Sequence, residues 1–485
     1  MGDNDGKRKL SDDDGDADSN QNGSTKRLKI AEPCDAGVLL YSGLTDYAER
    51  NDGKITKSEA VKWSAFQYES LEGVSMREVS TCPVAYHVLA ISEDYKVYSW
   101  GVNSKGQLGQ GDCKDRRNPT LIESLSGYKV VAVATGRGHS LVLTDDGNVF
   151  AFGDNSAGQC GVGSKENQVT NPKRVDYTGP SIVKMACGSE FSLILNEEGT
   201  IFSFGHPENG QLGHGSENKE IVARREVYHY EYSPMAISVY REVDTDNGEV
   251  TFHGQPRFTD IQCGSNHSCA IDDDQRLFTW GFGGYGRLGH NSTQNEMTPR
   301  LMNRLHRVTG RADGGVLKVT CGSQFNIVQT TVPKCSYIFG QLNLNGEAAM
   351  YPKFVEDLQG WNVRHVVCGM RGWSLLADDA VIACQYSPGY GSIAMGEKKK
   401  SSGSPLIVTP FKDMHVYRLG LGYMHGTFIV RNETDKDKKE LEKFPVLSFE
   451  DSKVEPTESA PAKGKGKTAK GRGGKKQAAT GRKKK

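Results

Sequence analysis

The chain of 485 residues has no run approaching the roughly 18 consecutive apolar residues that a bilayer-spanning helix needs. Its first residues lack the apolar core of a secretory signal peptide. Eleven cysteines are present, but no two form a C-x-x-C pair, and an odd number suits reduced thiols better than a disulfide framework. We therefore expect no membrane-spanning segment and a protein kept in the cytosol or the nucleus.

Motifs for common enzyme chemistry are missing as well. The chain has no G-x-x-x-x-G-K-[ST] phosphate loop, no G-x-S-x-G nucleophile elbow and no H-E-x-x-H zinc motif. Residues 281–286 spell G-F-G-G-Y-G, but the RLGHNSTQN that follows lacks the helical pattern that a dinucleotide site places under a pyrophosphate. We therefore predict no hydrolytic or redox chemistry and no cofactor.

Glycine, in contrast, is abundant, and many of the 57 glycines recur at fixed positions. Four segments align without gaps, and each reads as an aromatic, β-branched strand followed by a glycine-rich turn. They span residues 97–109, 149–161, 201–213 and 277–289. Weaker copies at 337–348 and 382–396 and a partial copy at 38–43 make seven.

A second signature, of the form A-C-G-x-x-H/F-S-L, precedes every one of these strands except the first. Its clear copies begin at residues 134, 186, 262, 320 and 367, with weaker ones at 82–91 and 422–430. The strand aromatic recurs after 52 residues, from Trp100 to Phe152 and again to Phe204. Four short strands with their turns need about 40 to 50 residues. The sequence therefore predicts an all-β fold, a seven-bladed β-propeller.

The order of the signatures predicts how the ring closes. The chain starts with a second hairpin arm at 38–43, and it leaves an unpartnered first arm at 425–430. Pairing these two segments would remove the exposed sheet edges. Cys384 and Gln385 stand where an aromatic residue and a glycine are expected, which predicts an irregular sixth or seventh blade.

Some cysteines and histidines have metal-ligand spacing, as in Cys263-x-x-x-His267. Cys187, Cys263, Cys321 and Cys368 all precede the signature glycine, where another copy has Thr135. The histidine position of the same signature holds His87, His139, His267 and His425, but also Phe191, Phe325 and, after a one-residue shift, Trp373. A metal ligand cannot be replaced by phenylalanine, whereas a packed position can. We therefore predict core packing and no metal site.

The two recurring motifs resemble those of the regulator of chromosome condensation family, which are seven-bladed β-propellers, and the resemblance covers residues 38–430. FGHPENGQLGH (204–214), TWGFGGYGRLGH (279–290) and AMYPK...DLQGW (349–361) are most similar to the type-2 branch. This resemblance implies a chromosome- and microtubule-associated protein that binds small GTPases and regulates mitosis and GTPase activation. The alternative that it implies is a guanine-nucleotide exchange factor proper for a GTPase of the Ras superfamily, including the nuclear-transport GTPase.

The third and fourth full copies are 76 residues apart, from Phe204 to Trp280, about 24 more than the regular spacing. Within this insertion, at about 228–256, residues 236–254 read as two strands around the turn residues Asp-Asn-Gly. Alternation would place Ile237, Val239 and Val243 on one face of the first strand. In the family, exchange activity depends on a β-wedge that protrudes from the propeller, and a decorated loop without a partner is the other interpretation. The candidate partner contacts are Tyr240, Arg241, Glu242, Asp244 and Asp246.

The chain has 60 Lys and Arg against 60 Asp and Glu, but its last segment, 459–485, has eleven basic and no acidic residues. Without apolar residues it cannot form a core, so we predict a disordered tail that contacts the phosphates of DNA or chromatin, or another polyanion. A solvated tail is the alternative. The candidate nucleic-acid contacts are Lys463, Lys465, Lys467, Lys470, Arg472, Lys475, Lys476, Arg482, Lys483, Lys484 and Lys485.

Residues 1–35 mix acidic and basic groups, and we predict that they are disordered. Their two basic clusters resemble a bipartite nuclear-import signal. The cluster residues are Lys7, Arg8, Lys9, Lys26, Arg27 and Lys29. The domain prediction is completed by the propeller at 36–431 and a charged linker, or short helix, at 432–458. We expect the protein in the nucleus and on chromosomes, with cytoplasmic or spindle association in mitosis.

Overall fold

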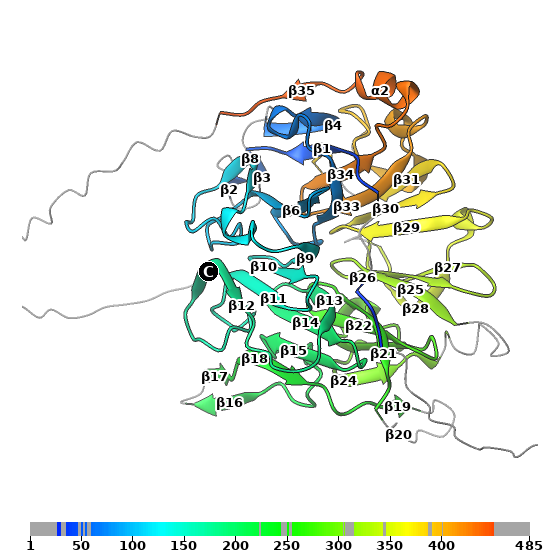
Figure 1. Ribbon diagram of the computed structural model, residues 1–485. Helices are drawn as coiled ribbons and strands as arrows, with labels where there is room; N and C mark the ends of the chain where they lie inside the picture. The colour runs from blue at the N-terminus through cyan, green and yellow to red at the C-terminus, as the bar shows by residue number, and fades with distance from the viewer. Residues whose placement is uncertain are drawn as a thin grey trace, which may run out of the picture. The chain divides into compact units, whose positions relative to one another are not determined.

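Each of the seven repeat copies forms an antiparallel sheet, or blade, in the computed structural model (Figure 1). The structure describes residues 27–30, 35–46, 50–51, 54–55, 60–222, 225–243, 250–251, 255–303, 305, 315–342, 346–386, 390–399 and 401–450. The chain up to Phe449 forms one unit, which holds all the blades. The prediction of a seven-bladed β-propeller is confirmed.

The first three blades follow one another along the chain. Blade one comprises β5 (Met76–Ser80), β6 (His87–Ser92), β7 (Val97–Gly101) and β8 (Arg116–Leu121). Blade two comprises β9 (Val130–Thr135), β10 (His139–Thr144), β11 (Val149–Asp154) and β12 (Gln168–Arg174). Blade three comprises β13 (Ile182–Cys187), β14 (Phe191–Asn196), β15 (Ile201–Gly205) and β18 (Glu231–Ala236).

The next three blades have the same strand order. Blade four comprises β21 (Phe258–Cys263), β22 (His267–Asp272), β23 (Leu277–Gly281) and β24 (Glu296–Leu301). Blade five comprises β25 (Val316–Cys321), β26 (Phe325–Thr330), β27 (Ser336–Gly340) and β28 (Ala349–Phe354). Blade six comprises β29 (Val363–Cys368), β30 (Gly372–Ala377), β31 (Ala380–Gln385) and β32 (Ser402–Ile407).

Blade seven joins the two ends of the propeller. Its inner strands are β33 (Val416–Leu421) and β34 (His425–Val430). Strand β34 pairs with β1 (Val38–Leu44), and β1 pairs in turn with β4 (Val61–Tyr68). Strand β1 is antiparallel to β34, with Val38 opposite Val430 and Gly43 opposite His425. The predicted pairing of residues 38–43 with 425–430 is therefore confirmed.

The innermost strand of every blade contacts the innermost strand of the next. These strands are β5, β9, β13, β21, β25, β29 and β33, and β33 contacts β5 again. The ring is thus closed. The second strand of each blade is buried along its whole length, as expected for a strand covered on both faces.

The repeated glycines lie against the aromatic side chains of the following blade. A Cβ atom on Gly109 would come within 3.0 Å of the ring of Phe152, and one on Gly161 within 2.7 Å of the ring of Phe204. Gly109 also has a φ of 67°, in the left-handed region that favours glycine. Phe152 is fully buried. The strand aromatic and the turn glycine of the repeat are therefore two halves of one contact between blades.

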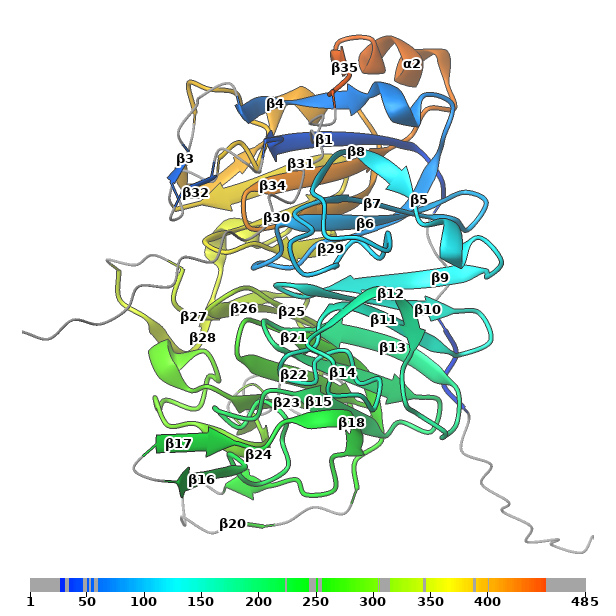
Figure 2. The same cartoon turned by 90° about the vertical axis from the view of Figure 1, so that its left-hand side faces the viewer.

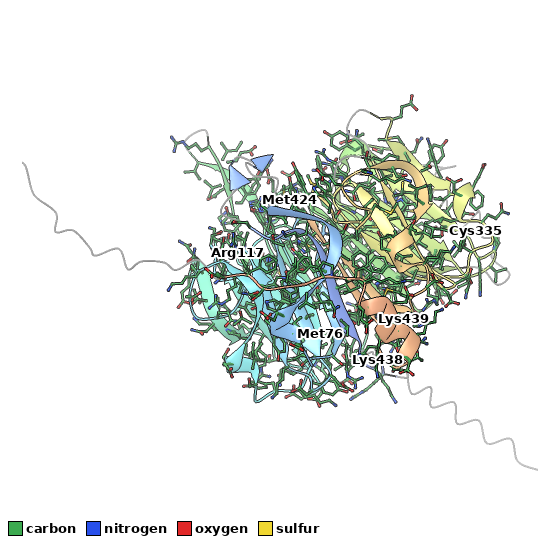
Figure 3. All side chains as sticks on the ribbon, turned by 90° about the horizontal axis from the view of Figure 1, so that it is seen from above. Met76, Arg117, Cys335, Met424, Lys438 and Lys439 are labelled. Carbon is green, nitrogen blue, oxygen red and sulfur yellow. The ribbon has the colours of Figure 1, made fainter. Side chains whose placement is uncertain are left out.

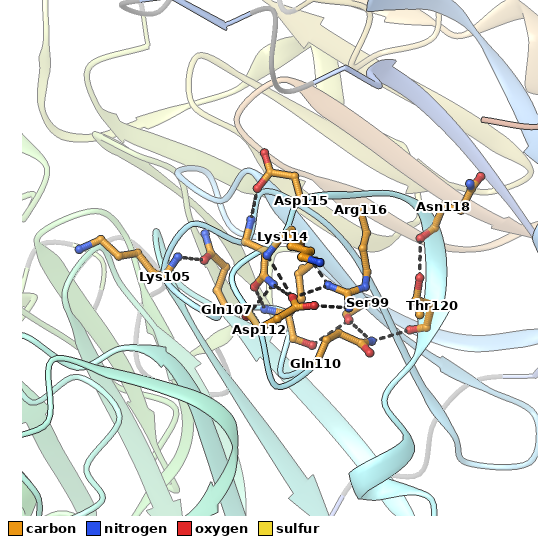
Figure 4. Close-up of polar contacts among 12 residues, drawn as sticks. Ser99, Lys105, Gln107, Gln110, Asp112, Lys114, Asp115, Arg116, Asn118 and Thr120 are labelled. Atoms are coloured by element: carbon orange, nitrogen blue, oxygen red, sulfur yellow. Dashed lines mark hydrogen bonds and ion pairs between the residues drawn. The ribbon is translucent and has the colours of Figure 1, made fainter. Parts of the chain in front are cut away.

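The polar residues of the repeat hold the turn in shape (Figure 4). In blade one the Asn103 side chain accepts a hydrogen bond from the Leu108 backbone N–H at 2.9 Å and donates one to the backbone carbonyl of Asp112 at 2.9 Å. The Gln107 side chain accepts from the Lys105 N–H at 2.8 Å. These bonds satisfy backbone groups that the turn would otherwise leave unpaired.

Short elements complete the unit. Five 3-10 helices are described: η2 (Glu69–Leu71), η3 (Glu123–Leu125), η4 (Gly284–Gly286), η5 (Glu356–Leu358) and η6 (Thr409–Phe411). Three further pairs of short strands are β2 (Arg50–Asn51) with β3 (Lys54–Ile55), β16 (Lys219–Val222) with β17 (Arg225–Tyr228), and β19 (Glu242–Val243) with β20 (Val250–Thr251). Near its end the chain forms α2 (Asp435–Leu441) and β35 (Val446–Leu447).

The structure corrects two predictions about regularity and boundaries. The copy around Cys384 and Gln385 forms the regular strand β31, because Cys384 is fully buried in the core and the Gln385 side chain accepts a hydrogen bond from Ser392 Oγ at 3.0 Å. The predicted linker is structured up to Phe449, since β35 runs parallel to β4 and adds a fifth strand to blade seven.

Candidate functional site

The propeller has two different faces, which the strand pairing defines. On the signature face, loops join the first strand of a blade to the second and the third to the fourth, and these loops carry the glycine signatures. On the linker face, loops join the second strand to the third and one blade to the next. Gly205 pairs with both Phe191 and Glu231, which places the loop between β15 and β18 on the signature face.

The surplus residues of blade three are divided between these faces. On the signature face, the loop between β15 and β18 spans 206–230, whereas the matching loop of blade two spans 155–167. On the linker face, residues 237–257 connect β18 to β21. Figure 1 shows β16 and β17 on the opposite side of the lower blades from β19 and β20, and Figure 2 shows β16 and β17 to the left of β18.

The signature-face hairpin, β16 with β17, consists almost entirely of exposed residues. Ile221 is 75% exposed, Val222 49% and Val227 40%. The register places Glu220 opposite Val227 and Val222 opposite Arg225. Each cross-strand pair thus joins one charged side chain to one apolar or aromatic side chain, on a ribbon whose outer edges pair with no other described strand. An exposed apolar group of this kind marks an interaction surface.

The base of this hairpin is fixed to the propeller by aromatic contacts. The ring of His206 lies 5.2 Å from that of Tyr228 and 5.0 Å from that of Tyr230. Asn218 Nδ2 donates to Glu231 Oε1 at 2.9 Å. The Tyr228 hydroxyl donates to Glu226 Oε2 at 3.0 Å. The hairpin is therefore presented at a defined place on the signature face.

The sequence did not reveal this hairpin, because the residues between its strands, Ala223 and Arg224, carry none of the glycine, asparagine or aspartate that typical hairpin turns need. The signal available was the similarity of the two segments, K-E-I-V at 219–222 and R-E-V-Y at 225–228, each of which ends on β-branched or aromatic residues.

Two antiparallel strands flank the predicted turn, as expected, but they are the short β19 and β20. β18 ends at Ala236, and 237–240 is not a strand, so the predicted alternation is wrong. Ile237 is fully buried, Val239 is 40% exposed and Tyr240 is 3% exposed. The Tyr240 hydroxyl donates to the carbonyl of Ile237 at 2.5 Å. Tyr240 therefore anchors the insertion in the core and offers no contact to a partner.

Arg241 is held against blade four. Its guanidinium forms an ion pair with Glu296, which Arg300 Nη1 also contacts at 2.6 Å. Glu242 begins β19, which pairs with β20. Asp244 and Asp246 lie outside the described residues, as do the eleven basic residues of the tail. Three of the five predicted partner contacts, Tyr240, Arg241 and Glu242, thus lie in the described part of the chain, and one of these three, Tyr240, is buried.

The second basic cluster of the N-terminal segment contacts the propeller. Arg27 Nη1 lies 3.2 Å from Glu197 Oε1, and the Leu28 N–H donates to the Glu197 carbonyl at 2.9 Å. Leu28 and Ile30 pack against the core of blades two to four. The expectation of disorder throughout 1–35 is wrong for residues 27–30. Lys7, Arg8, Lys9 and Lys26 lie outside the described residues.

The buried titratable groups serve packing. Burial lowers the pKa of His267 to about 3 and raises the pKa of the Cys187 thiol above its ordinary range. Ligand atoms of His267, Cys269 and Cys321 lie within 4.8 Å of one another, but His267 Nε2 is already bonded to Asn326 Oδ1 at 2.9 Å. Gly281 ends β23, and Gly284–Gly286 form the single turn η4 before β24, so the segment is a blade turn as predicted.

No helix in the described part of the chain has the length and apolarity to cross a bilayer.

Comparison with known proteins gives a consistent result. A family model described as RCC1-like domain matches residues 84–328. Protein RCC2 homolog from Danio rerio is 37% identical over 429 residues, which cover 87% of this chain and 86% of that protein. Protein RCC2 from Homo sapiens is 37% identical over 429 residues, covering 87% of this chain and 81% of that protein.

Among solved structures, Prp20p from Saccharomyces cerevisiae matches 86% of this chain and 95% of its own with a TM-score of 0.63 and 18% identity. At that identity the likeness concerns the fold alone.

Proposed function

Since this chain belongs to the RCC1-like family and is similar to the RCC2 proteins over most of its length, we propose that it is a non-enzymatic regulator that binds a small GTPase through its signature face and chromatin through its basic tail. The observation that carries the proposal is the exposed hairpin β16–β17. Prp20p, which shares the fold, is described as binding Gsp1p, a small GTPase, and histones.

The chemistry of the hairpin supports a protein partner. The register places Val222 and Val227 on one side of the ribbon and Ile221 on the other. Burial of either side against a partner removes apolar surface from water, which is the dominant favourable contribution in most protein association. Glu220, Arg225 and Glu226 would supply the polar rim of such an interface. A regulator of this kind needs no acid or base, because preference for one nucleotide state of the GTPase is enough to shift nucleotide affinity by the same factor.

The linker-face insertion is the alternative contact surface. Arg241 and Glu242, with Asp244 and Asp246, would then meet the partner on the opposite face. The two surfaces make opposite predictions for substitutions, so one experiment separates them.

The test is binding of purified small GTPases of the Ras superfamily, nucleotide-free and GDP-loaded, to the full chain. The double variant Ile221→Glu, Val227→Glu places charge on the signature-face hairpin, and we expect its affinity to fall at least about tenfold. The matched control is Val239→Glu, since Val239 is 40% exposed, like Val227, but lies on the linker face. Loss of binding in the control alone would contradict the proposal and assign the linker face.

Nucleotide release from the same GTPases decides the mode of regulation. We expect binding without acceleration. Acceleration by the full chain that disappears in the hairpin variant would instead make the protein an exchange factor proper.

For the tail, the proposal assigns phosphate contacts to the lysines and arginines of 459–485, and nuclear import to the basic clusters near the N-terminus. Chromosomes would be the site of action, with microtubules as a further partner in mitosis. We expect that deletion of 459–485 abolishes most DNA binding at about 50 mM salt and removes its steep salt dependence. Equal binding by the full and shortened chains at two salt concentrations would remove the tail from this function.

A further inference from the structure

The innermost strands place seven equivalent residues around the central channel. Each is the third residue of its strand. At each of them the pairing with the second strand of the same blade changes register. Such a β-bulge changes the direction of a side chain. The residues, which we call the bulge ring, are Glu78, Ala132, Lys184, Asp260, Lys318, His365 and Arg418.

A cavity of about 250 Å³ lies inside the channel, and residues from all seven innermost strands line it. Glu78, Lys318 and His365 of the bulge ring are among them, together with Gln262 and Thr320. A water molecule takes about 30 Å³ of liquid volume, so the cavity has room for a hydrated ion.

The charges of the bulge ring do not cancel. Lys184 Nζ lies 2.9 Å from Asp260 Oδ1, and Arg418 Nε lies 3.3 Å from Glu78 Oε2. Lys318 has no carboxylate within 4.0 Å of its ammonium group in the part of the chain that the structure describes. Two anions therefore face three cations, and one positive charge is left over at Lys318.

The last polar member of the bulge ring does not change this balance. Burial lowers the pKa of His365 to about 3, and its Nε2 lies 3.3 Å from the Leu419 carbonyl, so the imidazole is neutral at physiological pH. Burial also lowers the pKa of Lys318, and the charges of Asp260 and Glu78 oppose this only in part. A buried cation without a compensating anion is unfavourable.

We propose that the central channel binds one small monovalent anion of the size of chloride, held by the Lys318 ammonium group with Gln262 as a neutral donor. Lys318 belongs to β25 and Gln262 to the adjacent β21, and both line the cavity. Glu78 lines the same cavity but is compensated by Arg418, so the anion site lies on the side of blades four and five. This site is independent of the proposed GTPase contact.

The test is thermal unfolding of the full chain at constant ionic strength, with sodium chloride progressively replacing sodium gluconate, whose organic anion is much larger than chloride. We expect a saturable rise in Tm of about 1–2 °C with chloride, because a ligand that binds only the folded state stabilises it. The rise should be absent in Lys318→Met and retained in Lys318→Arg. Equal Tm values in the two salts, or an unchanged chloride effect in Lys318→Met, would overturn the proposal.

A matched control uses the other lysine of the bulge ring. In gluconate, Lys318→Met should unfold at the same or a higher temperature than the native chain, since it removes an uncompensated charge, whereas Lys184→Met should unfold at a lower one because it strands Asp260. Soaking a crystal of the native chain in bromide tests the anion site without any substitution. We expect an anomalous peak beside Lys318 Nζ, and a channel without a peak there would contradict the site.

Discussion

At the scale of single residues, the signature histidines join neighbouring blades. His87 Nε2 lies 2.8 Å from Ser140 Oγ, which in turn donates to the carbonyl of Gln107 at 2.8 Å. His139 Nε2 lies 2.9 Å from Ser192 Oγ in the same way. The exchange of histidine for phenylalanine between copies predicted a buried position, and that is confirmed. The bond itself could not be predicted, because its partner lies 53 residues further along the chain.

The buried histidines make stability depend on pH. Burial lowers the pKa of seven histidines, four of which belong to the signature, well below the ordinary 6.5. The values are about 3 for His87, His267, His290, His365 and His425, and about 4 for His139 and His214. Since the unfolded chain takes up these protons and the folded chain does not, stability is constant above about pH 7 and falls as the pH drops through 6.5 toward 4. Each imidazole contributes about 1.4 kcal/mol per pH unit in that range.

Urea unfolding between pH 8 and pH 5 measures this slope. The variant His139→Phe copies the residue found at the same position in blade three, Phe191, and we expect it to reduce the proton uptake on unfolding by about one. A slope in His139→Phe equal to that of the native chain would show that His139 is not responsible.

At the scale of elements, the sequence predicted the strands that belong to the repeat. It missed the hairpin β16–β17 and the structured segment after blade seven, which lie outside the repeat. The paired signatures revealed the blades because strand, turn glycine and aromatic recur together. The hairpin β16–β17 has no such copy, and its turn lacks the usual residues. The segment after blade seven was predicted as a charged linker from its charged residues 433–443, although the apolar run F-P-V-L-S-F at 444–449 was a signal for a strand.

That segment is bound to the closing blade. The Gln67 N–H donates to the Pro445 carbonyl at 2.9 Å, and Gln67 Nε2 donates to the Leu441 carbonyl at 3.1 Å. Phe444 is 8% exposed and stacks on Phe411 at 5.8 Å between ring centroids. Figure 3 shows α2 with Lys438 and Lys439 at the edge of the propeller.

We expect Phe444→Ala to lower the free energy of unfolding by about 3 kcal/mol, because it removes a buried ring. It should also speed hydrogen exchange at the Gln67 amide, whose partner lies next to Phe444. Lys439→Ala, on the exposed side of α2, is the control. It should change the free energy of unfolding by no more than about 0.5 kcal/mol and leave the exchange rate of the Gln67 amide unchanged. Full protection of Gln67 in Phe444→Ala would show that the segment is held by other contacts.

At the scale of the whole molecule, closure of the ring depends on the pairing of β1 with β34. The prediction of this contact from the sequence succeeded because each end carried half of a recognisable hairpin. The excess charge in the channel was not predictable, since it emerges only when seven strands from separate repeats face one another.

A covalent cross-link tests closure directly. In the double variant Val38→Cys, Val430→Cys the new thiols occupy directly opposed positions, as a disulfide requires. We expect it to form under mild oxidation, to change mobility on a non-reducing gel and to raise stability by about 4 kcal/mol, because it closes a very long loop. The single variants are the controls. Failure of the double variant to cross-link while folded would contradict the register.

The closing blade also sets the order of events during synthesis. Strand β1 leaves the ribosome early, but β34 and β35, which cover its blade, are made nearly four hundred residues later. At about 5–20 residues per second the wait lasts tens of seconds. During that time the apolar strand β1 has no partner on one edge. Chaperone protection of this strand should therefore matter more for this protein than for a propeller in which every blade is formed by one continuous segment.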